Sequence, residues 1–359
     1  MQSAYRSAVG ISNAFDPGVK RIWAQSFLAL SIVGGLLAYR LSGPAPTRLF
    51  REQRSLMGTA WSLEVPLNGH SEDEARRAVA AAYRELDRIE ALMSEWRPES
   101  PISQVDAAAG RNPVEVPEEL RALLERSIDY SRKTEGTFDV TWRGMGRIWH
   151  FDDTFRIPTA AEVAKARRSI DYRRIHIDGN SVYLPEGTNI GLGGIAKGYA
   201  IDRAAAVLRR EGFPDSLVDG GGDILASGTR YGHPWQIGVQ DPRAERGKLL
   251  GVVEISNAAL VSSGDYERFR LVDGVRYHHL IDPRTGWPAT AAMASTVLAP
   301  TAEQGVVLGK AIFILGPEKG LSLAKAEGLE ALVIDPAQKQ HTTPGFAKAF
   351  RAAAAVPIR

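Results

Sequence analysis

Cysteine is absent from all 359 residues, which excludes disulfides, thiolate metal ligands and cysteine nucleophiles. A charge excess of either sign is also missing, because 44 basic residues face 42 acidic ones and the net charge is only +2. A nucleic-acid binder usually has an excess of basic residues, which this sequence lacks, so nucleic acid is not expected as a partner. The 44% of hydrophobic residues is ordinary for a globular chain with a sizeable core.

Near the N-terminus, residues 23–41 form an apolar run that follows the basic pair Lys20 and Arg21. Its interruptions are Gln25, Ser26, Ser31 and Arg40. The run is long enough to cross a bilayer and predicts a membrane anchor. A cleaved signal peptide is the alternative, but no small-x-small cleavage site follows. We expect a tail at 1–22, the anchor at 23–41, a linker at 42–54 and one folded domain at 55–350.

The segment 55–350 has the pattern of a single mixed α/β domain, in which helical and strand periodicities alternate. Ser71 and Glu74 form a capping box, and apolar residues from Val79 to Met93 recur at helical spacing. A second helix is expected to end at Gly136. Residues 235–239 alternate as a strand does. The same alternation over 275–281 would place His279 on the apolar face and His278 on the opposite face.

A glycine-rich turn, "GLGGIAKG" from Gly191, leads into a helical pattern. It superficially fits the dinucleotide-binding fingerprint, but Pro185 and Gly187 interrupt the strand that should precede it. A turn that feeds a helix N-terminus offers backbone N–H groups to a phosphate, and Lys197 would add a positive charge. The alternative is a glycine turn that only packs a helix against a sheet.

Lys310 is the only charged residue in the apolar run from Gly305 to Gly316, which otherwise has the pattern of a buried helix. Burying an unpaired ammonium is costly. The side chain should therefore reach water, on a polar stripe with Glu303, or neutralise something negative.

Four stretches, "MGTAWSLEV", "EGTFDVTWRGMGRIWHF", "LVDGGGDILASG" and "SSGDYERFRLVDGVRYHHLIDPRTGWPA", resemble the ApbE family in order and spacing. The resemblance covers roughly residues 55–345. It implies a flavin transferase that splits FAD, releases AMP and links FMN by a phosphoester to Ser or Thr of a partner protein. It further implies a soluble domain on the periplasmic side of the cell inner membrane and an acceptor that is a membrane electron-transfer subunit.

The resemblance also implies roles for individual residues. His279 takes the place of the catalytic histidine, whereas a core histidine is the alternative. Asp282 either orients His279 or caps the Asp-Pro turn. The residues expected to contact FAD are Met57, Trp96, Thr137, Phe138, Asp139, Gly193, Gly194, Lys197, Ser263, Asp265 and Ile281. An ordinary core role is the alternative for Met57, Trp96 and Phe138, and a Ser-Gly-Asp turn is the alternative for Ser263 and Asp265.

The sequence departs from the family where Mg²⁺ is usually held. An Asp and a Thr at one-turn spacing are expected there, but this chain has Val306 and Lys310, which offer no oxygen ligand. Two further departures are Gly191 in place of an Asp and Asp106 in place of an Asn.

We hypothesise that the Lys310 ammonium takes the place of Mg²⁺ on the FAD pyrophosphate and makes transfer independent of metal, though slower. Lys310 therefore joins His279 and Asp282 as a candidate catalytic residue. The alternative is a flavin-binding protein that docks on or chaperones a membrane redox complex without catalysis.

Overall fold

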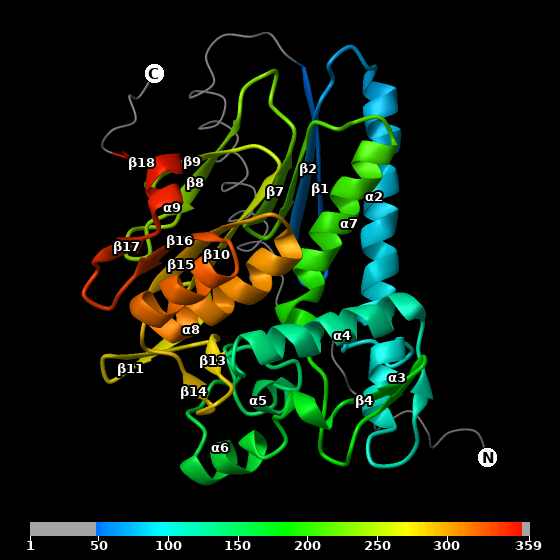
Figure 1. Ribbon diagram of the computed structural model, residues 1–359, viewed down its shortest axis with the longest axis vertical. Coiled ribbons are helices and arrows are strands. Elements are labelled where there is room, and N and C mark those ends of the chain that lie inside the picture. Colours follow the sequence, from blue (N-terminus) through cyan, green and yellow to red (C-terminus); the bar gives the residue numbers. More distant parts are fainter. Residues whose placement is uncertain (1–47, 354–359) are drawn as a thin grey trace, which may run out of the picture. The chain divides into compact units, whose positions relative to one another are not determined.

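The computed structural model describes residues 48–353 (Figure 1). The expected anchor at 23–41 and the tail before it lie outside this range. Among residues 48–353, no helix is both long and apolar enough to cross a membrane.

An eight-stranded antiparallel sheet forms the centre of the domain. Its order is β1 (Leu49–Leu56), β2 (Thr59–Pro66), β6 (Ser216–Gly220), β7 (Asp223–Ser227), β10 (Ala258–Gly264), β15 (Ala294–Ala299), β16 (Glu330–Ile334) and β17 (Gln340–Thr342). Three long helices pack against it: α2 (Glu72–Met93), α7 (Ala196–Arg210) and α8 (Ala302–Ala326), the last with a break at Gly316.

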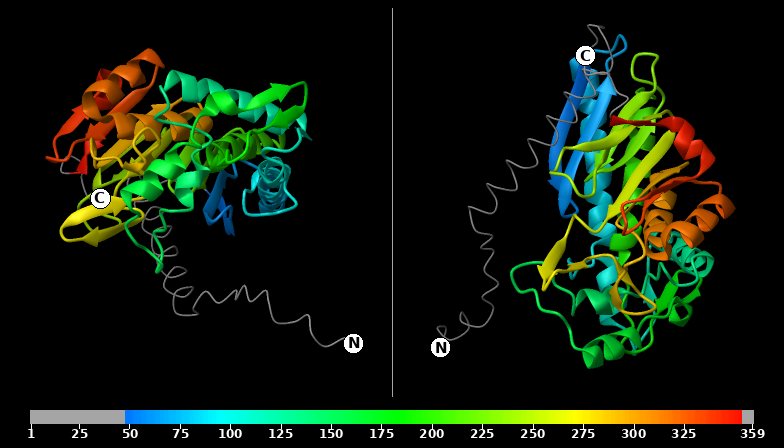
Figure 2. Two further views of the ribbon diagram at one scale, coloured as in Figure 1. Left: turned by 90° about the horizontal axis from the view of Figure 1, so that it is seen from below. Right: turned by 90° about the vertical axis from the view of Figure 1, so that its left-hand side faces the viewer.

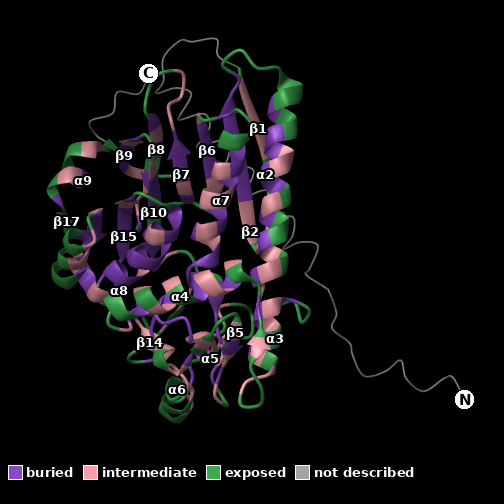
Figure 3. Ribbon diagram, turned by 45° about the vertical axis from the view of Figure 1, so that its right-hand side comes forward, coloured by how far each residue is buried: buried purple, intermediate pink, exposed green. Residues whose placement is uncertain are grey.

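The two faces of this sheet are covered by different layers. In β10, Ala259 and Val261 belong to the core shared with α2, α7 and α8, whereas Leu260 belongs to a second core. Successive strand residues point to opposite faces, so both faces are buried. The second core includes Trp235 of the small sheet, whose order is β18 (Phe350–Ala352), β9 (Leu249–Ile255) and β8 (Trp235–Gln240). Figure 3 shows the central strands as buried.

Below the sheet in Figure 1, one further helix of several turns and a set of short elements build the region around the glycine turn. They are α3 (Pro101–Ala107), β3 (Val114–Glu115), α4 (Glu118–Lys133), α5 (Arg143–Gly146), α6 (Ala160–Arg167), η1 (Tyr172–Arg174), β4 (His176–Asp178), β5 (Ser181–Tyr183) and η2 (Leu192–Gly194). The C-terminal half adds β11 (Phe269–Val272), β12 (Val275–His278), β13 (Ile281–Asp282), β14 (Trp287–Pro288) and α9 (Pro344–Ala349). Strands β11 and β12 form a separate hairpin, visible in yellow in Figure 2.

Several sequence predictions are confirmed. The Ser71 hydroxyl accepts from the Glu74 N–H, and the Glu74 carboxylate accepts in return from the Ser71 N–H, so the capping box starts α2 as expected. Helix α4 ends just before Gly136, which has a φ of 76°. The inward residues of β8 alternate as predicted. The mixed α/β class is therefore confirmed for the described domain.

Two predictions were wrong. Residues 49–54, expected as linker, belong to edge strand β1. The side chains of β1 are half-buried or exposed, so its sequence lacks the apolar alternation that would predict a strand. The strand expected over 275–281 breaks after His278. As a result His278 is the buried histidine, with its Nε2 2.8 Å from the Ala289 carbonyl oxygen, and His279 follows the strand end half-buried.

Candidate active site

Helix α8 brings Lys310 close to the large sheet because glycines line its inner side. A Cβ added at Gly305 would lie 2.8 Å from Cγ2 of Val261, and the Ser295 hydroxyl donates to the Gly309 carbonyl at 3.0 Å. Lys310 is half-buried, and its Nζ donates to the Val306 carbonyl at 3.0 Å. The polar-stripe alternative is wrong, because Glu303 is buried and its carboxylate binds Arg126 of α4 at 2.9 and 3.0 Å.

Two charged residues act on Lys310 from neighbouring elements. Lys197, in the first turn of α7, places Nζ 2.5 Å from Oδ2 of Asp223, which is buried at the start of β7. Burial lowers the pKa of Lys310 to about 8, the Asp223 carboxylate opposes this shift, and the Lys197 ammonium adds to it. Two ammonium groups, one from α7 and one from α8, are thus influenced by a single carboxylate.

His279 lies close enough to Lys310 for the ammonium to influence its titration. Burial, together with the positive charges of Arg268, His278 and Lys310, lowers the pKa of His279 to about 3. The imidazole is therefore neutral at pH 7. Its Nδ1 is buried and has no hydrogen-bond partner within residues 48–353. The free nitrogen can accept a hydrogen bond, but with a pKa of about 3 the imidazole is a weak base in the free protein.

Asp282 is held by the turn that follows β13. Its carboxylate accepts from the Arg284 backbone N–H at 2.9 Å and from the Arg284 Nε at 3.0 Å. With these bonds the Asp282 side chain caps the turn that follows it. A role for Asp282 in orienting His279 stays a prediction.

The residues Thr137, Phe138 and Asp139 are buried beside the glycine turn. Thr137 Oγ1 donates to the Thr134 carbonyl at 2.7 Å, and Asp139 accepts from the Thr141 N–H and hydroxyl at 2.8 and 2.7 Å. The Phe138 ring would lie 2.8 Å from a Cβ at Gly194, so only glycine fits there without displacing the ring. Gly193 has open space around it.

The remaining predicted flavin residues occupy varied surroundings. Trp96 is 82% exposed, whereas Met57 adopts a φ of 49° and donates its N–H to Glu90 at 3.0 Å. Asp265 is buried and binds the Arg243 guanidinium through two bonds of 2.6 Å. Ser263 and Ile281 are buried. Their contacts with FAD stay predictions.

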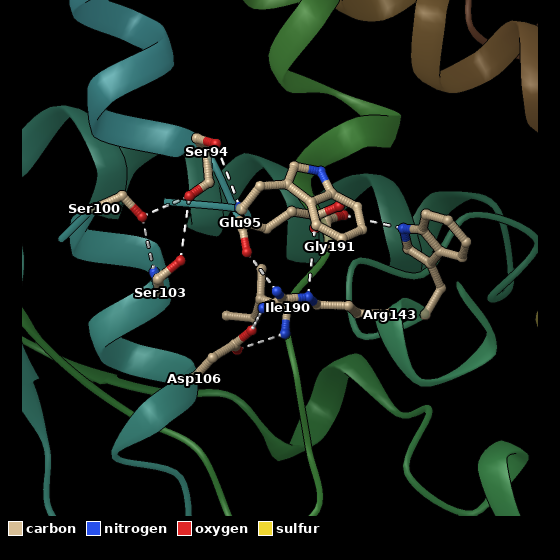
Figure 4. Close-up of polar contacts among 10 residues, drawn as sticks. Ser94, Glu95, Ser100, Ser103, Asp106, Arg143, Ile190 and Gly191 are labelled. Carbon is tan, nitrogen blue, oxygen red and sulfur yellow. Dashed lines mark hydrogen bonds and ion pairs between the residues drawn. The ribbon is translucent and has the colours of Figure 1, made fainter. Parts of the chain in front are cut away.

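Sequence reasoning missed two groups of residues. Asp223 lies in a quoted motif but was not singled out, since its partner Lys197 is 26 positions away. The second group lies beneath the glycine turn, where the Arg143 guanidinium contacts the Asp106 carboxylate and the Glu95 carbonyl (Figure 4). Asp106 also accepts from the Ile190 N–H at 2.8 Å. The signal available was the unusual Asp at 106.

The side chains at 306 and 310 do not fit a divalent cation. Val306 is fully buried and aliphatic, and Lys310 presents an ammonium, which has no lone pair to donate and repels a dication. Across residues 48–353, no cluster of three or more His, Asp or Glu side chains could hold a metal ion. The surroundings of Lys310 instead favour an anion that two ammonium groups can neutralise.

In this site Lys197 pairs with Asp223, both of these charges act on Lys310, and Lys310 in turn acts on His279. The ApbE family model matches residues 57–333. The chain belongs to the ApbE family.

Relatives and solved structures agree with this assignment. The chain is 32% identical to the FAD:protein FMN transferase of Treponema pallidum over 86% of this chain and 91% of that protein. It is 29% identical to an FAD:protein FMN transferase of Klebsiella pneumoniae, over 82% and 86%. The ApbE protein from Thermotoga maritima superposes with a TM-score of 0.78 at 28% identity, covering 85% of this chain and all of that one. For the flavin transferase ApbE from Vibrio cholerae, the TM-score is 0.76 at 26% identity, over 85% and 100%.

Proposed function

We propose that this chain is an FAD:protein FMN transferase in which the ammonium of Lys310 performs the electrostatic work for which the family uses Mg²⁺. FAD is the substrate of the family's transferases, and the family model covers most of the described domain. The proposal that transfer needs no metal is supported by the position of Lys310, which is half-buried and close enough to Lys197, Asp223 and His279 for their charges to interact.

The chemistry follows from these groups. A Ser or Thr hydroxyl of the acceptor forms a new O–P bond to the FMN phosphorus while the bond from that phosphorus to the bridging oxygen breaks. AMP leaves with the bridging oxygen, and the hydroxyl proton passes to the imidazole of His279. Lys310 and Lys197 neutralise the charge that develops on the phosphate oxygens. One ammonium supplies less charge than a dication and no coordination geometry, so transfer is slower.

The test uses the full-length protein in detergent, freed of metal with EDTA and mixed with FAD and an acceptor domain that carries a flavinylation Thr. Covalent FMN is read by in-gel fluorescence, and FAD binding is measured separately. We expect transfer in EDTA that Lys310→Ala abolishes. Transfer that requires added Mg²⁺ would contradict the proposal, and FAD binding without transfer in either condition would assign the chain as a flavin-binding protein.

A matched variant sharpens this test. Val306→Asp combined with Lys310→Thr introduces two oxygen ligands four residues apart on α8. If Lys310 stands in for a metal, this double variant should be inactive in EDTA and regain transfer when Mg²⁺ is added. If it behaves as wild type in both conditions, then neither position acts on the phosphates.

We further propose that residues 23–41 anchor the chain in the cell inner membrane, with the transferase domain on the periplasmic side and the acceptor in a membrane electron-transfer subunit. The support is the apolar run in the sequence. Carbonate extraction of membranes and protease digestion of spheroplasts test this. Release by carbonate, or protection of the domain from added protease, would contradict it.

A further inference from the structure

The Glu95 side chain lies beside Gly191 at the glycine turn, where its carboxylate forms a long ion pair with Arg143 (Figure 4). The side chain is only 12% exposed, and its Oε2 is buried without a hydrogen-bond partner in the described chain. The Nε of Arg143 is 4.0 Å from Oε2, beyond hydrogen-bond distance. A buried carboxylate oxygen without a donor is unfavourable in the free protein, so it calls for an explanation.

The neighbouring groups are already bound to other partners. The Arg143 guanidinium contacts the Asp106 carboxylate and the Glu95 main-chain carbonyl, and Asp106 also receives the Ile190 N–H. Two carboxylates thus share one guanidinium. Burial raises the pKa of both carboxyl groups, with Arg143 acting against the shift. Asp106 receives the Arg143 and Ile190 donors, whereas for Glu95 only the Leu192 backbone N–H acts on the carboxylate and Oε2 receives no hydrogen bond.

Gly191 brings this oxygen to the border of the turn. A Cβ at Gly191 would lie 3.2 Å from Glu95 Oε2 and 2.7 Å from Trp142 Nε1, so a side chain at that position would displace its neighbours. The Glu95 carboxylate therefore occupies the space next to residue 191, at the start of the segment that leads into α7. The following residue, Trp96, leaves its ring 82% exposed.

We propose that Glu95 is a substrate-recognition residue, which accepts a hydrogen bond from a hydroxyl or ring N–H of FAD. A ring of FAD stacked on Trp96 would bring such donors next to the carboxylate, and the missing partner of Oε2 would then be the substrate itself. Gly191 is the position where the family commonly has an Asp, so Glu95 supplies a carboxylate from another segment of the chain. The inference rests on the proposed function only for the identity of the ligand.

A purely structural role for Glu95 makes a different prediction. If Glu95 served to hold Arg143 in place, its removal would lower the stability of the free protein. If Glu95 serves the substrate, its removal relieves a buried unpaired oxygen, and the stability of the free protein is unchanged or higher. Binding and stability together therefore separate the two roles.

The experiment measures dissociation constants of FAD, FMN and AMP by calorimetry for the full-length wild type, Glu95→Gln and Glu95→Ala, with thermal unfolding of each free protein. Glu99→Gln is the matched control, since it removes an exposed carboxylate from the same loop. We expect Glu95→Ala to weaken FAD binding about 10- to 100-fold, Glu95→Gln to weaken it less, and neither to lower the melting temperature.

Weaker binding of FMN but not of AMP would place the donor in the flavin half, and the reverse would place it in the adenosine half. Unchanged FAD affinity in Glu95→Ala would overturn the inference, as would a melting temperature that falls together with affinity. Because this experiment measures FAD binding and not transfer, it tests Glu95 even if transfer proves to require a metal.

Discussion

The pH dependence of flavin transfer provides the sharpest test of Lys310. Its pKa is lowered to about 8, so the ammonium is charged below that value and is lost as pH rises through it. About nine-tenths of the free protein carries the charge at pH 7 and about one-tenth at pH 9. If the charge acts on the phosphates, kcat/KM should be flat below pH 7 and fall about tenfold per pH unit well above pH 8.

Charged and titratable groups near Lys310 could also contribute to the pH dependence of transfer. Asp223 comes from β7, Lys197 from α7, and His279 follows β12. His279 titrates near pH 3, far below this range. FAD brings negative charge to the ammonium and should raise its pKa in the complex, so the fall in kcat should lie at higher pH than the fall in kcat/KM.

Two variants isolate the charge. Arginine remains protonated throughout this range, so Lys310→Arg should retain activity and lose the alkaline fall. Lys310→Met keeps an unbranched side chain without charge, and its kcat/KM at pH 7 should be lower by about 10²–10³, as for loss of one transition-state donor. The assay is initial-rate flavinylation in EDTA between pH 6 and 10. An alkaline fall that persists in Lys310→Arg, or a wild-type rate that increases through pH 8, would refute the reasoning.

Two further predictions concern the charge that acts on Lys310 and the packing of α7 against α8. Asp223→Asn removes the carboxylate that favours the charged ammonium, so the alkaline fall of kcat/KM should move to lower pH; an unmoved profile would show that Asp223 does not act on Lys310. Gly198→Ala should lower the free energy of unfolding in urea by about 1–3 kcal/mol, because the added Cβ would lie 2.5 Å from the Ala302 carbonyl at the α7–α8 contact. Gly193→Ala, which has open space, is its control, and equal losses in both would contradict the packing argument.

Local elements were predictable where the sequence carries a local physical signal. The capping box of α2 involves residues three apart, and the alternation in β8 needs only neighbouring positions. The sequence also predicted that α8 is a buried helix with one lysine in it, because a single charged residue in an apolar run can be recognised without knowing what it contacts. Strand β1 was not, because an edge strand exposes one side of its backbone and tolerates charged side chains.

The two histidines show where periodicity fails. Alternation over 275–281 assumes one continuous strand, but β12 ends at His278 and the chain turns before β13. The break reverses which histidine is buried. Its cause is tertiary: His278 contacts the Ala289 carbonyl, 11 positions on, and the Phe313 ring of α8, 35 positions on.

The sequence by itself determined the family, the helix that carries Lys310 and the loss of oxygen ligands at 306 and 310, because each depends on residue identity and short spacing. Only the tertiary structure decided which charges meet. The tertiary fold pairs Asp223 of β7 with Lys197 of α7 and brings both charges near enough to act on Lys310 of α8, and a glycine at 191 leaves the space beside Glu95. Such encounters join residues that lie at least 26 positions apart, and no local pattern encodes them; the close packing of helices on the sheet fixes them.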